Sequence, residues 1–108
     1  MEKLKPHYEL KKIKSFLCDE KSREITRISR EGAVALGYMD VEDMLAIIET
    51  LTQRNFYKSM TTKRDTTVWQ DVYKISDESE NKLYIKLQLS FNKKKAIVIQ
   101  FKRDSGED

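Results

Sequence analysis

The sequence contains few of the residues that mark several common classes of protein. Of its 108 residues, one is Cys, one is His, one is Pro and three are Gly. A single thiol excludes a disulfide framework, and Cys18 and His7 are together too few to ligate zinc. We expect Cys18 to be a half-buried helix residue and His7 to be a surface or helix-cap residue. No metal or other cofactor is expected.

Low Pro and Gly content and the absence of low-complexity runs also argue against a long linker. The length suits one domain over residues 1–108, with a disordered tail from about residue 104 to residue 108. No window approaches the roughly 18 consecutive apolar residues of a membrane span, and the Lys-rich N-terminus lacks the apolar core of a secretory signal. We therefore expect a cytoplasmic protein with no membrane partner.

Positive charge is concentrated near the C-terminus. The net charge is only +3, but residues 81–103 contain seven basic residues and no acidic one. These are Lys82, Lys86, Lys93, Lys94, Lys95, Lys102 and Arg103. A polyanion could dock on this segment. The alternative is that the lysines only keep an edge strand soluble, and charge alone does not decide between the two.

The first half of the chain has helical periodicity. Apolar residues recur at helical spacing over residues 8–19, and a shorter helix is expected from Ser29, as N-cap, to near Gly37. A third helix follows Asp40, a good N-cap, with a broad apolar stripe over residues 41–51. We expect this stripe to face the core.

After Arg54 the apolar period changes from 3.6 to 2. Four strands are expected, over residues 56–62, 68–75, 83–91 and 96–102. Helices followed by strands predict an α+β fold, in which an antiparallel sheet carries the N-terminal helices on one face.

The two last strands predict their own register. Residues 83–91 alternate, with Leu83 to Phe91 at odd positions facing the core, and Ile97, Ile99 and Phe101 are expected to face it too. Opposed residues share a face, so paired numbers must sum to an even value. A loop of residues 92–94 gives a sum of 186 and places Tyr84 opposite Lys102. The next allowed register leaves the two residues diagonal.

The strand at residues 68–75 is apolar on both faces, so patterning does not say which way Gln70 points. If Gln70 shares the face of Tyr84, one even pairing places Gln70 opposite Gln88. Trp69, Phe56 and Tyr73 are expected in the core. Asp71 is expected to pair with Arg64 or to form a turn hydrogen bond.

An RNA 2′-hydroxyl can attack its own adjacent phosphate if the protein supplies a base, an acid and positive charge. With one His, the candidate groups are Lys58, Gln70, Tyr84 and Lys102. Unperturbed Lys and Tyr side chains titrate near pH 10, so their surroundings would have to assist proton transfer.

The segment from Phe56 to Tyr73 is the most specific motif in the chain. It reads F-Y-K-S-M-T-T, a short polar loop and then W-Q-D-V-Y. This pattern resembles the MqsR toxins, and the sequence also begins M-E-K-x-x-P-H, as that family does. The resemblance implies a RelE-like fold and ribosome-independent, metal-independent cleavage of mRNA, with a family preference for GCU triplets. It also implies a DNA-binding, MqsA-like antitoxin that neutralises the toxin.

Lys58, Gln70, Tyr84 and Lys102 coincide with the positions implicated in catalysis in that family. Further RNA contacts are expected from seven other residues. These are Met60, Thr61, Lys86, Gln88, Lys93, Lys94 and Lys95. The alternative function is a non-catalytic RNA-binding or transcription-regulating module that uses the same basic face.

Overall fold

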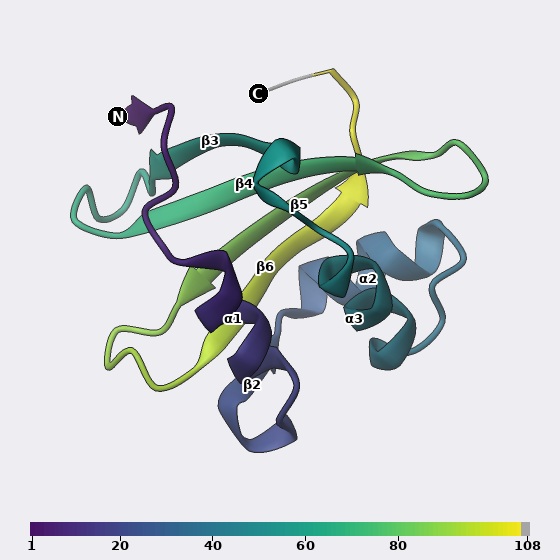
Figure 1. Ribbon diagram of the computed structural model, residues 1–108, viewed down its shortest axis with the longest axis horizontal. Helices are drawn as coiled ribbons and strands as arrows, with labels where there is room; N and C mark the ends of the chain where they lie inside the picture. Colours follow the sequence, from purple (N-terminus) through teal and green to yellow (C-terminus); the bar gives the residue numbers. More distant parts are fainter. Residues whose placement is uncertain (107–108) are drawn as a thin grey trace.

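The computed structural model describes residues 1–106, within which three helices pack against a six-stranded sheet (Figure 1). The helices are α1 (Leu10–Leu17), α2 (Arg27–Ala35) and α3 (Val41–Glu49). The strands are β1 (Glu2–Lys3), β2 (Arg23–Ile25), β3 (Phe56–Thr61), β4 (Trp69–Ser76), β5 (Lys82–Leu89) and β6 (Ala96–Arg103). The sheet order is β1-β3-β4-β5-β6-β2, antiparallel except where β2 runs parallel to β6. The predicted α+β class and the four long strands are confirmed, whereas the RelE-like fold stays a prediction.

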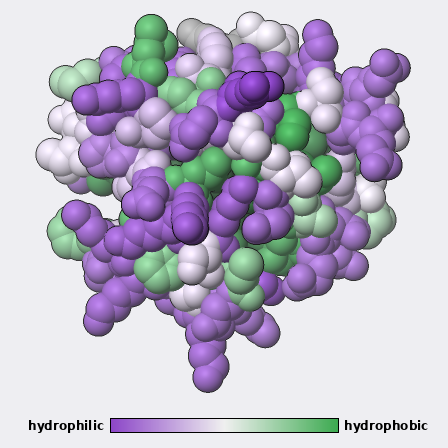
Figure 2. Space-filling view, in the orientation of Figure 1, coloured by the Kyte–Doolittle hydropathy of each residue, from purple (hydrophilic) through white to green (hydrophobic). Residues whose placement is uncertain are grey.

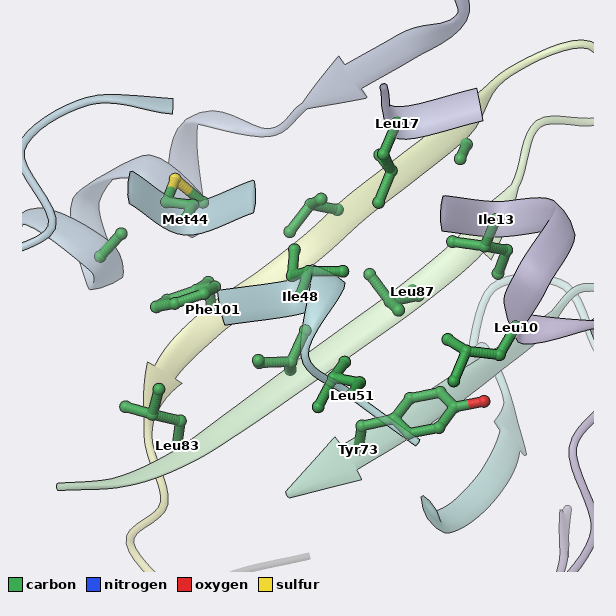
Figure 3. Close-up of a cluster of buried hydrophobic side chains, with 14 of the residues drawn as sticks. Leu10, Ile13, Leu17, Met44, Ile48, Leu51, Tyr73, Leu83, Leu87 and Phe101 are labelled. Carbon is green, nitrogen blue, oxygen red and sulfur yellow. The ribbon is translucent and has the colours of Figure 1, made fainter. Parts of the chain in front are cut away.

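The hydrophobic core lies between the helices and one face of the sheet. Apolar residues of α1 and α3 meet those of β4, β5 and β6 (Figure 3). The labelled members are Leu10, Ile13, Leu17, Met44, Ile48, Leu51, Tyr73, Leu83, Leu87 and Phe101. Among the four helix-face positions of β5, Leu83, Ile85 and Leu87 are fully buried and Leu89 is nearly so. The helices therefore cover one face of the sheet, as predicted.

The helix boundaries confirm some sequence signals and correct others. Asp40 caps α3, with a reciprocal capping box to Asp43, and Gly37 adopts a positive φ of 95° just after α2. However, Thr26 rather than Ser29 caps α2, because the Thr26 hydroxyl accepts the Ser29 backbone N–H. Cys18 lies at the end of α1 and is exposed, so its expected half-burial is wrong.

The β5–β6 hairpin has the predicted register at one end and a different register at the other. Tyr84 pairs with Lys102, but Leu87 pairs with Val98, because a bulge at Ile99 adds one residue to β6. The bulge places Ala96 and Val98 in the core in place of Ile97 and Ile99. The link is also longer than predicted, spanning residues 90–95, and it leaves Phe91 96% exposed rather than core-facing.

Two of the three aromatic residues expected in the core belong to it or pack against it, and the third does not. Tyr73 is fully buried in it and Phe56 packs against it. Trp69 lies outside the core cluster, where the His7 ring stacks on it with centroids 5.5 Å apart and the Lys3 Nζ lies 4.1 Å from its centroid. An indole is a good surface for both neighbours, and the N-terminal segment that supplies them could not be placed from periodicity.

The end of the chain remains attached to the sheet as far as Asp104. The backbone N–H of Asp104 donates to the Lys82 carbonyl, and the Asp104 carboxylate lies 3.3 Å from the Lys74 ammonium. The end of the expected tail, residues 107–108, lies outside the described residues. None of the helices within residues 1–106 has the length and apolar character needed to cross a bilayer. The helical side of the molecule is mainly hydrophilic, with hydrophobic residues visible between the charged ones (Figure 2).

Candidate active site

The face of the sheet opposite the helices, here called the open face, carries most of the candidate residues. Strand parity and pairing assign positions to this face. Among these positions are Lys58, Met60, Gln70, Val72, Lys74, Tyr84, Lys86, Gln88 and Lys102. In Figure 1 α1 and α3 lie in front of the sheet, so the open face is turned away from the viewer. All four predicted catalytic residues therefore share one face.

Tyr84 reaches the open face from β5, one of the two central strands of the sheet. It pairs with Lys102 across the β5–β6 ladder, and the Lys102 Nζ is 5.0 Å from the centroid of its ring. The Lys86 Nζ is 5.8 Å from the same centroid. Tyr84 is only 3% exposed, yet it lies outside the hydrophobic core cluster. The predicted meeting of a phenol and an ammonium is confirmed.

Lys58 reaches the open face from β3, directly after a bulge at Tyr57. Its side chain is almost completely buried, and its Nζ forms a 2.6 Å ion pair with the carboxylate of Glu2. Glu2 is placed there because β1 pairs with β3, with Glu2 opposite Met60. The N-terminal strand thus brings a negative charge to a predicted catalytic lysine, a contact that the sequence pattern did not reveal.

Gln70 points to the open face, and the predicted pairing of β4 with β5 is confirmed. The observed pairs, such as Asp71 with Leu87, have the register that places Gln70 opposite Gln88. The Gln70 Nε2 donates to the Gln88 Oε1 over 2.8 Å. Met60 lies on the other side of Gln70 in the β3–β4 ladder. The side chains of Met60, Gln70 and Gln88 therefore form a row across the sheet, adjacent to the row that contains Lys58 and Lys86.

Positive charges crowd this face. The pKa of Lys86 is lowered, first by burial and then by the charges of Lys102 and Lys58. The charges of Lys102 and Lys58 therefore act on the Lys86 ammonium from strands on both sides of β5. Lys74 adds a further ammonium, 3.8 Å from the centroid of the Tyr57 ring. Lys74 was not predicted, because β4 is apolar on both faces and its orientation depended on the register.

The acidic groups near the open face are already engaged with lysines. Glu2 pairs with Lys58, and Asp104 with Lys74. Within the part of the chain that the structure describes, no cluster of three or more His, Cys, Asp or Glu side chains could hold a metal ion. The chemical groups that the open face presents are therefore ammonium, phenol and carboxamide.

The structure does not bring all the predicted RNA contacts to this place. Thr61 pairs with Trp69 and belongs to the opposite side of the sheet, where it is buried and its hydroxyl lies 3.5 Å from the Met1 carbonyl. Lys93, Lys94 and Lys95 are exposed at the tip of the β5–β6 hairpin, beyond the end of β5. Lys86, Gln88 and Met60 do lie on the open face, together with the four predicted catalytic residues.

Asp71 has a role that its motif did not reveal. It is fully buried on the helix-covered face, and its carboxylate accepts the backbone N–H groups of His7 and Tyr8 and, over 2.6 Å, the hydroxyl of Ser59. The expected pairing with Arg64 is wrong, since Arg64 lies in the exposed β3–β4 loop. Asp71 instead anchors the N-terminal segment to the sheet. The role could not be predicted from the motif, because His7 and Tyr8 are more than 60 residues away from Asp71 in the sequence.

Comparisons with known proteins agree with the resemblance carried by the motif from Phe56 to Tyr73. The family model described as "Motility quorum-sensing regulator, toxin of MqsA" matches residues 5–103. The mRNA interferase toxin MqsR of Escherichia coli (strain K12) is 42% identical over 74 residues, which cover 68% of this chain and 74% of that protein. Residues 5–103 contain all nine open-face residues named above, whereas Glu2, which pairs with Lys58 from β1, lies outside them. The chain therefore belongs to the MqsR toxin family.

Proposed function

We propose that this protein is an endoribonuclease toxin that cleaves mRNA on the open face. The observation that carries the proposal is that Lys58, Gln70, Tyr84 and Lys102, from four different strands, share one face of the sheet. Hydrophobic patterning did not require polar groups of these types to meet there. The relative in Escherichia coli is named an mRNA interferase, which agrees with this chemistry.

The proposed reaction is an internal transesterification. The 2′-oxygen of a ribose forms a bond to the adjacent phosphorus as its proton is removed, and the bond from phosphorus to the 5′-oxygen of the next nucleotide breaks as that oxygen gains a proton. The products are a 2′,3′-cyclic phosphate and a 5′-hydroxyl. Every atom comes from the RNA or from exchanged protons, so the proposal includes neither metal nor cofactor.

The geometry supports a distinct role for each group. Lys58 on β3 and Lys102 on β6 lie on opposite sides of β5 and stabilise the extra negative charge of the phosphorane. Tyr84 exchanges a proton with the nucleophile or the leaving group. Gln70 orients the scissile phosphate through its carboxamide, whose position is fixed by the hydrogen bond to Gln88. Lys86 increases the positive potential around the phenol.

Crowded ammonium groups favour this reaction electrostatically. Burial, and then the neighbouring cations Lys102 and Lys58, lower the pKa of Lys86, so these ammonium groups repel one another. A bound phosphate relieves that repulsion, and the phosphorane, with its additional charge, relieves it further. Such preorganised charge is often the largest single contribution to catalysis.

The remaining parts of the proposal rest on family membership. The chain acts on mRNA without the ribosome, and a cognate MqsA-like, DNA-binding antitoxin neutralises it. The family description names this protein class as the toxin of MqsA. Nothing in the open face requires a second macromolecule to complete the set of reactive groups.

Cleavage of naked RNA in a metal chelator tests the function directly. Purified protein and ribosome-free mRNA should yield fragments ending in 2′,3′-cyclic phosphate. Binding without cleavage would favour a non-catalytic RNA-binding or transcription-regulating module. Strict dependence on added metal or ribosomes would contradict the proposed mechanism.

Expression in cells gives a second test. The chain should arrest growth, the Lys58→Ala variant should not, and co-expression of the antitoxin should restore growth. Lys11→Ala is the matched control, since Lys11 is exposed on α1 on the other side of the molecule. Arrest by the Lys58→Ala variant would remove Lys58 from the site.

A further inference from the structure

A cavity of about 250 Å³ lies at the end of the sheet where β4 begins and β5 ends. Its walls come from three segments that are distant in the sequence: the N-terminal segment, the β3–β4 loop and the β5–β6 hairpin, which meet on the left of Figure 1. Its lining includes His7, Gln88, Phe91 and Lys93. This surface is here called the hairpin cavity, and its lining contains none of the four proposed catalytic residues.

The hairpin cavity is connected to the candidate active site through Gln88. Gln88 lines the cavity and accepts a hydrogen bond from Gln70 on the open face. Along β5, Gln88 is four residues from Tyr84, which corresponds to about 13 Å of strand. A short extended stretch of RNA with its phosphate at Tyr84 could therefore place a neighbouring base at the cavity.

The chemistry of the hairpin cavity suits a flat aromatic ligand on a negatively charged chain. Phe91 is 96% exposed beside three consecutive lysines, Lys93 to Lys95. An exposed phenyl ring next to cations is the combination that single-stranded nucleic acids use, with stacking on the ring and phosphates on the lysines. A phosphate alone would not need the aromatic wall.

His7 gives the hairpin cavity a directional polar group. Its Nδ1 lies 2.9 Å from the Lys3 Nζ, so Nδ1 accepts and a neutral ring carries its proton on Nε2. Burial, followed by the charge of Lys3, lowers the pKa of His7, and Lys93 lowers it as well, while Asp71 opposes them. A neutral imidazole at pH 7 offers hydrogen bonding without adding another charge, which suits the edge of a base.

From these observations we propose that the hairpin cavity binds one unpaired base of the RNA, stacked on Phe91, next to the phosphate held on the open face. The inference rests on the proposed function, and it assigns part of the sequence preference to the β5–β6 hairpin. The lysines of the hairpin tip then hold the backbone that leads to this base.

An abasic scan tests the proposal without any cleavage. The probe is a set of single-stranded oligonucleotides that contain a GCU triplet and carry 2′-fluoro riboses throughout, which removes the nucleophile, with an abasic site at each position in turn. Affinity is measured for the wild-type protein and for Phe91→Ala. Since Phe91 is exposed, this change should leave the fold intact, which thermal unfolding checks.

For the wild-type protein, one abasic position should weaken binding by about 5- to 100-fold, the effect of losing one stacked base. Phe91→Ala should weaken binding of the intact oligonucleotide to a similar extent and should abolish the penalty at that one position. Met39→Ala is the control, because Met39 is also an exposed apolar residue, 64% accessible, but lies between α2 and α3.

Equal abasic penalties in Phe91→Ala and wild type would overturn the proposal, as would wild-type affinity of Phe91→Ala. The outcome is separable from that of the cleavage experiment. If RNA is cleaved but Phe91 has no effect, the base site fails and the proposed function stands. If one abasic position weakens binding as predicted but RNA is not cleaved, the base site stands and the proposed function fails. Failure to bind any oligonucleotide would overturn the base site.

Discussion

The two faces of the sheet are made by the same strands but have different roles. One face packs against the helices, and the other carries the candidate active site. On β5, Leu83, Ile85 and Leu87 pack under the helices, whereas Tyr84 and Lys86 point to the open face. The covered face lowers the free energy by removing apolar surface from water. The open face instead brings like charges together, which costs stability. A shift of one residue along a strand thus separates folding from chemistry.

The N-terminal segment connects the two faces. On the covered side, Asp71 holds the backbone of His7 and Tyr8, and on the open side Glu2 pairs with Lys58. A segment with little secondary structure of its own therefore positions groups on both faces. The predictions below test whether the faces are as separable as the geometry implies.

Truncation of adjacent residues on β5 should produce the largest contrast. Ile85→Ala should reduce the free energy of unfolding by about 2–5 kcal/mol, because it leaves a cavity in the core. Lys86→Ala should change it by no more than about 1 kcal/mol, since the change also relieves repulsion from Lys102 and Lys58. Denaturant unfolding of both variants measures this difference.

In RNA binding the order of the two variants should be reversed, with the larger effect from Lys86→Ala. Lys86→Ala should weaken RNA binding and lower the slope of log affinity against log salt by about 0.7, the effect of one lost phosphate contact on a single strand. Ile85→Ala should retain the wild-type slope under conditions where it is folded. Equal stability losses in the two variants would break the comparison between the faces.

Asp71→Asn should have an intermediate effect, on the covered face alone. One oxygen is replaced by an amide donor where backbone N–H groups point, so we expect a loss of about 1–3 kcal/mol. Amide hydrogen exchange should show reduced protection of His7 and Tyr8. The control is Asp65→Asn in the exposed β3–β4 loop, which should cost no more than about 0.5 kcal/mol. Unchanged protection at His7 would exclude Asp71 as the anchor.

Glu2→Gln should have a smaller effect, on the open face. The change removes a negative charge 2.6 Å from the Lys58 ammonium, which should then attract phosphate more strongly. We expect a several-fold gain in affinity for uncleavable RNA. Glu24→Gln on β2 changes the net charge equally but lies at the opposite edge of the sheet, and should alter affinity less. A similar gain from both variants would mean that only net charge matters.

Tyr73→Phe should have the smallest effect at neutral pH, because the buried Tyr73 hydroxyl has no hydrogen-bond partner within residues 1–106. Burial, and then Asp71, raise the pKa of Tyr73 to about 12. A raised pKa in the folded state stabilises the protein fully below the unfolded value near 10, and this contribution is lost as the pH rises toward 12. The wild type should therefore lose up to about 1.4 kcal/mol per pH unit more than Tyr73→Phe in that window.

Unfolding curves at pH 7, 10 and 11.5 would measure this difference. If Tyr73→Phe is strongly destabilised at pH 7, its hydroxyl has a partner in solution. Identical alkaline profiles would show that Tyr73 does not titrate with folding.

The sequence predicted the parts of the fold that depend on local periodicity. Alternation on β5 and parity between strands placed Lys102 either opposite Tyr84 or diagonal to it. They paired Gln70 with Gln88 only if Gln70 shares the face of Tyr84. The bulge at Ile99 was not visible, because Ile97, Val98 and Ile99 are all apolar and either set could face the core. The Thr26 hydroxyl donates to the Ile99 carbonyl over 2.8 Å, so the bulge depends on a contact from a distant turn.

Contacts made by the N-terminal segment were also beyond reach of the sequence pattern. β1 and β2 have two and three residues, too few to show a period, and they form because the sheet edges offer backbone partners. Trp69 was predicted in the core from composition alone, whereas Lys3 and His7 hold it near the surface. Asp71 and Glu2 could be interpreted only once their partners were known.

Removing one oxygen atom from the open face tests the central claim most directly. Tyr84→Phe keeps the ring but deletes the phenol, and the account predicts a loss of cleavage rate of about 100-fold or more with little change in stability or in affinity for 2′-fluoro RNA. Rates of formation of the 2′,3′-cyclic phosphate should be compared for the two proteins at equal occupancy. Wild-type cleavage by Tyr84→Phe would contradict the account.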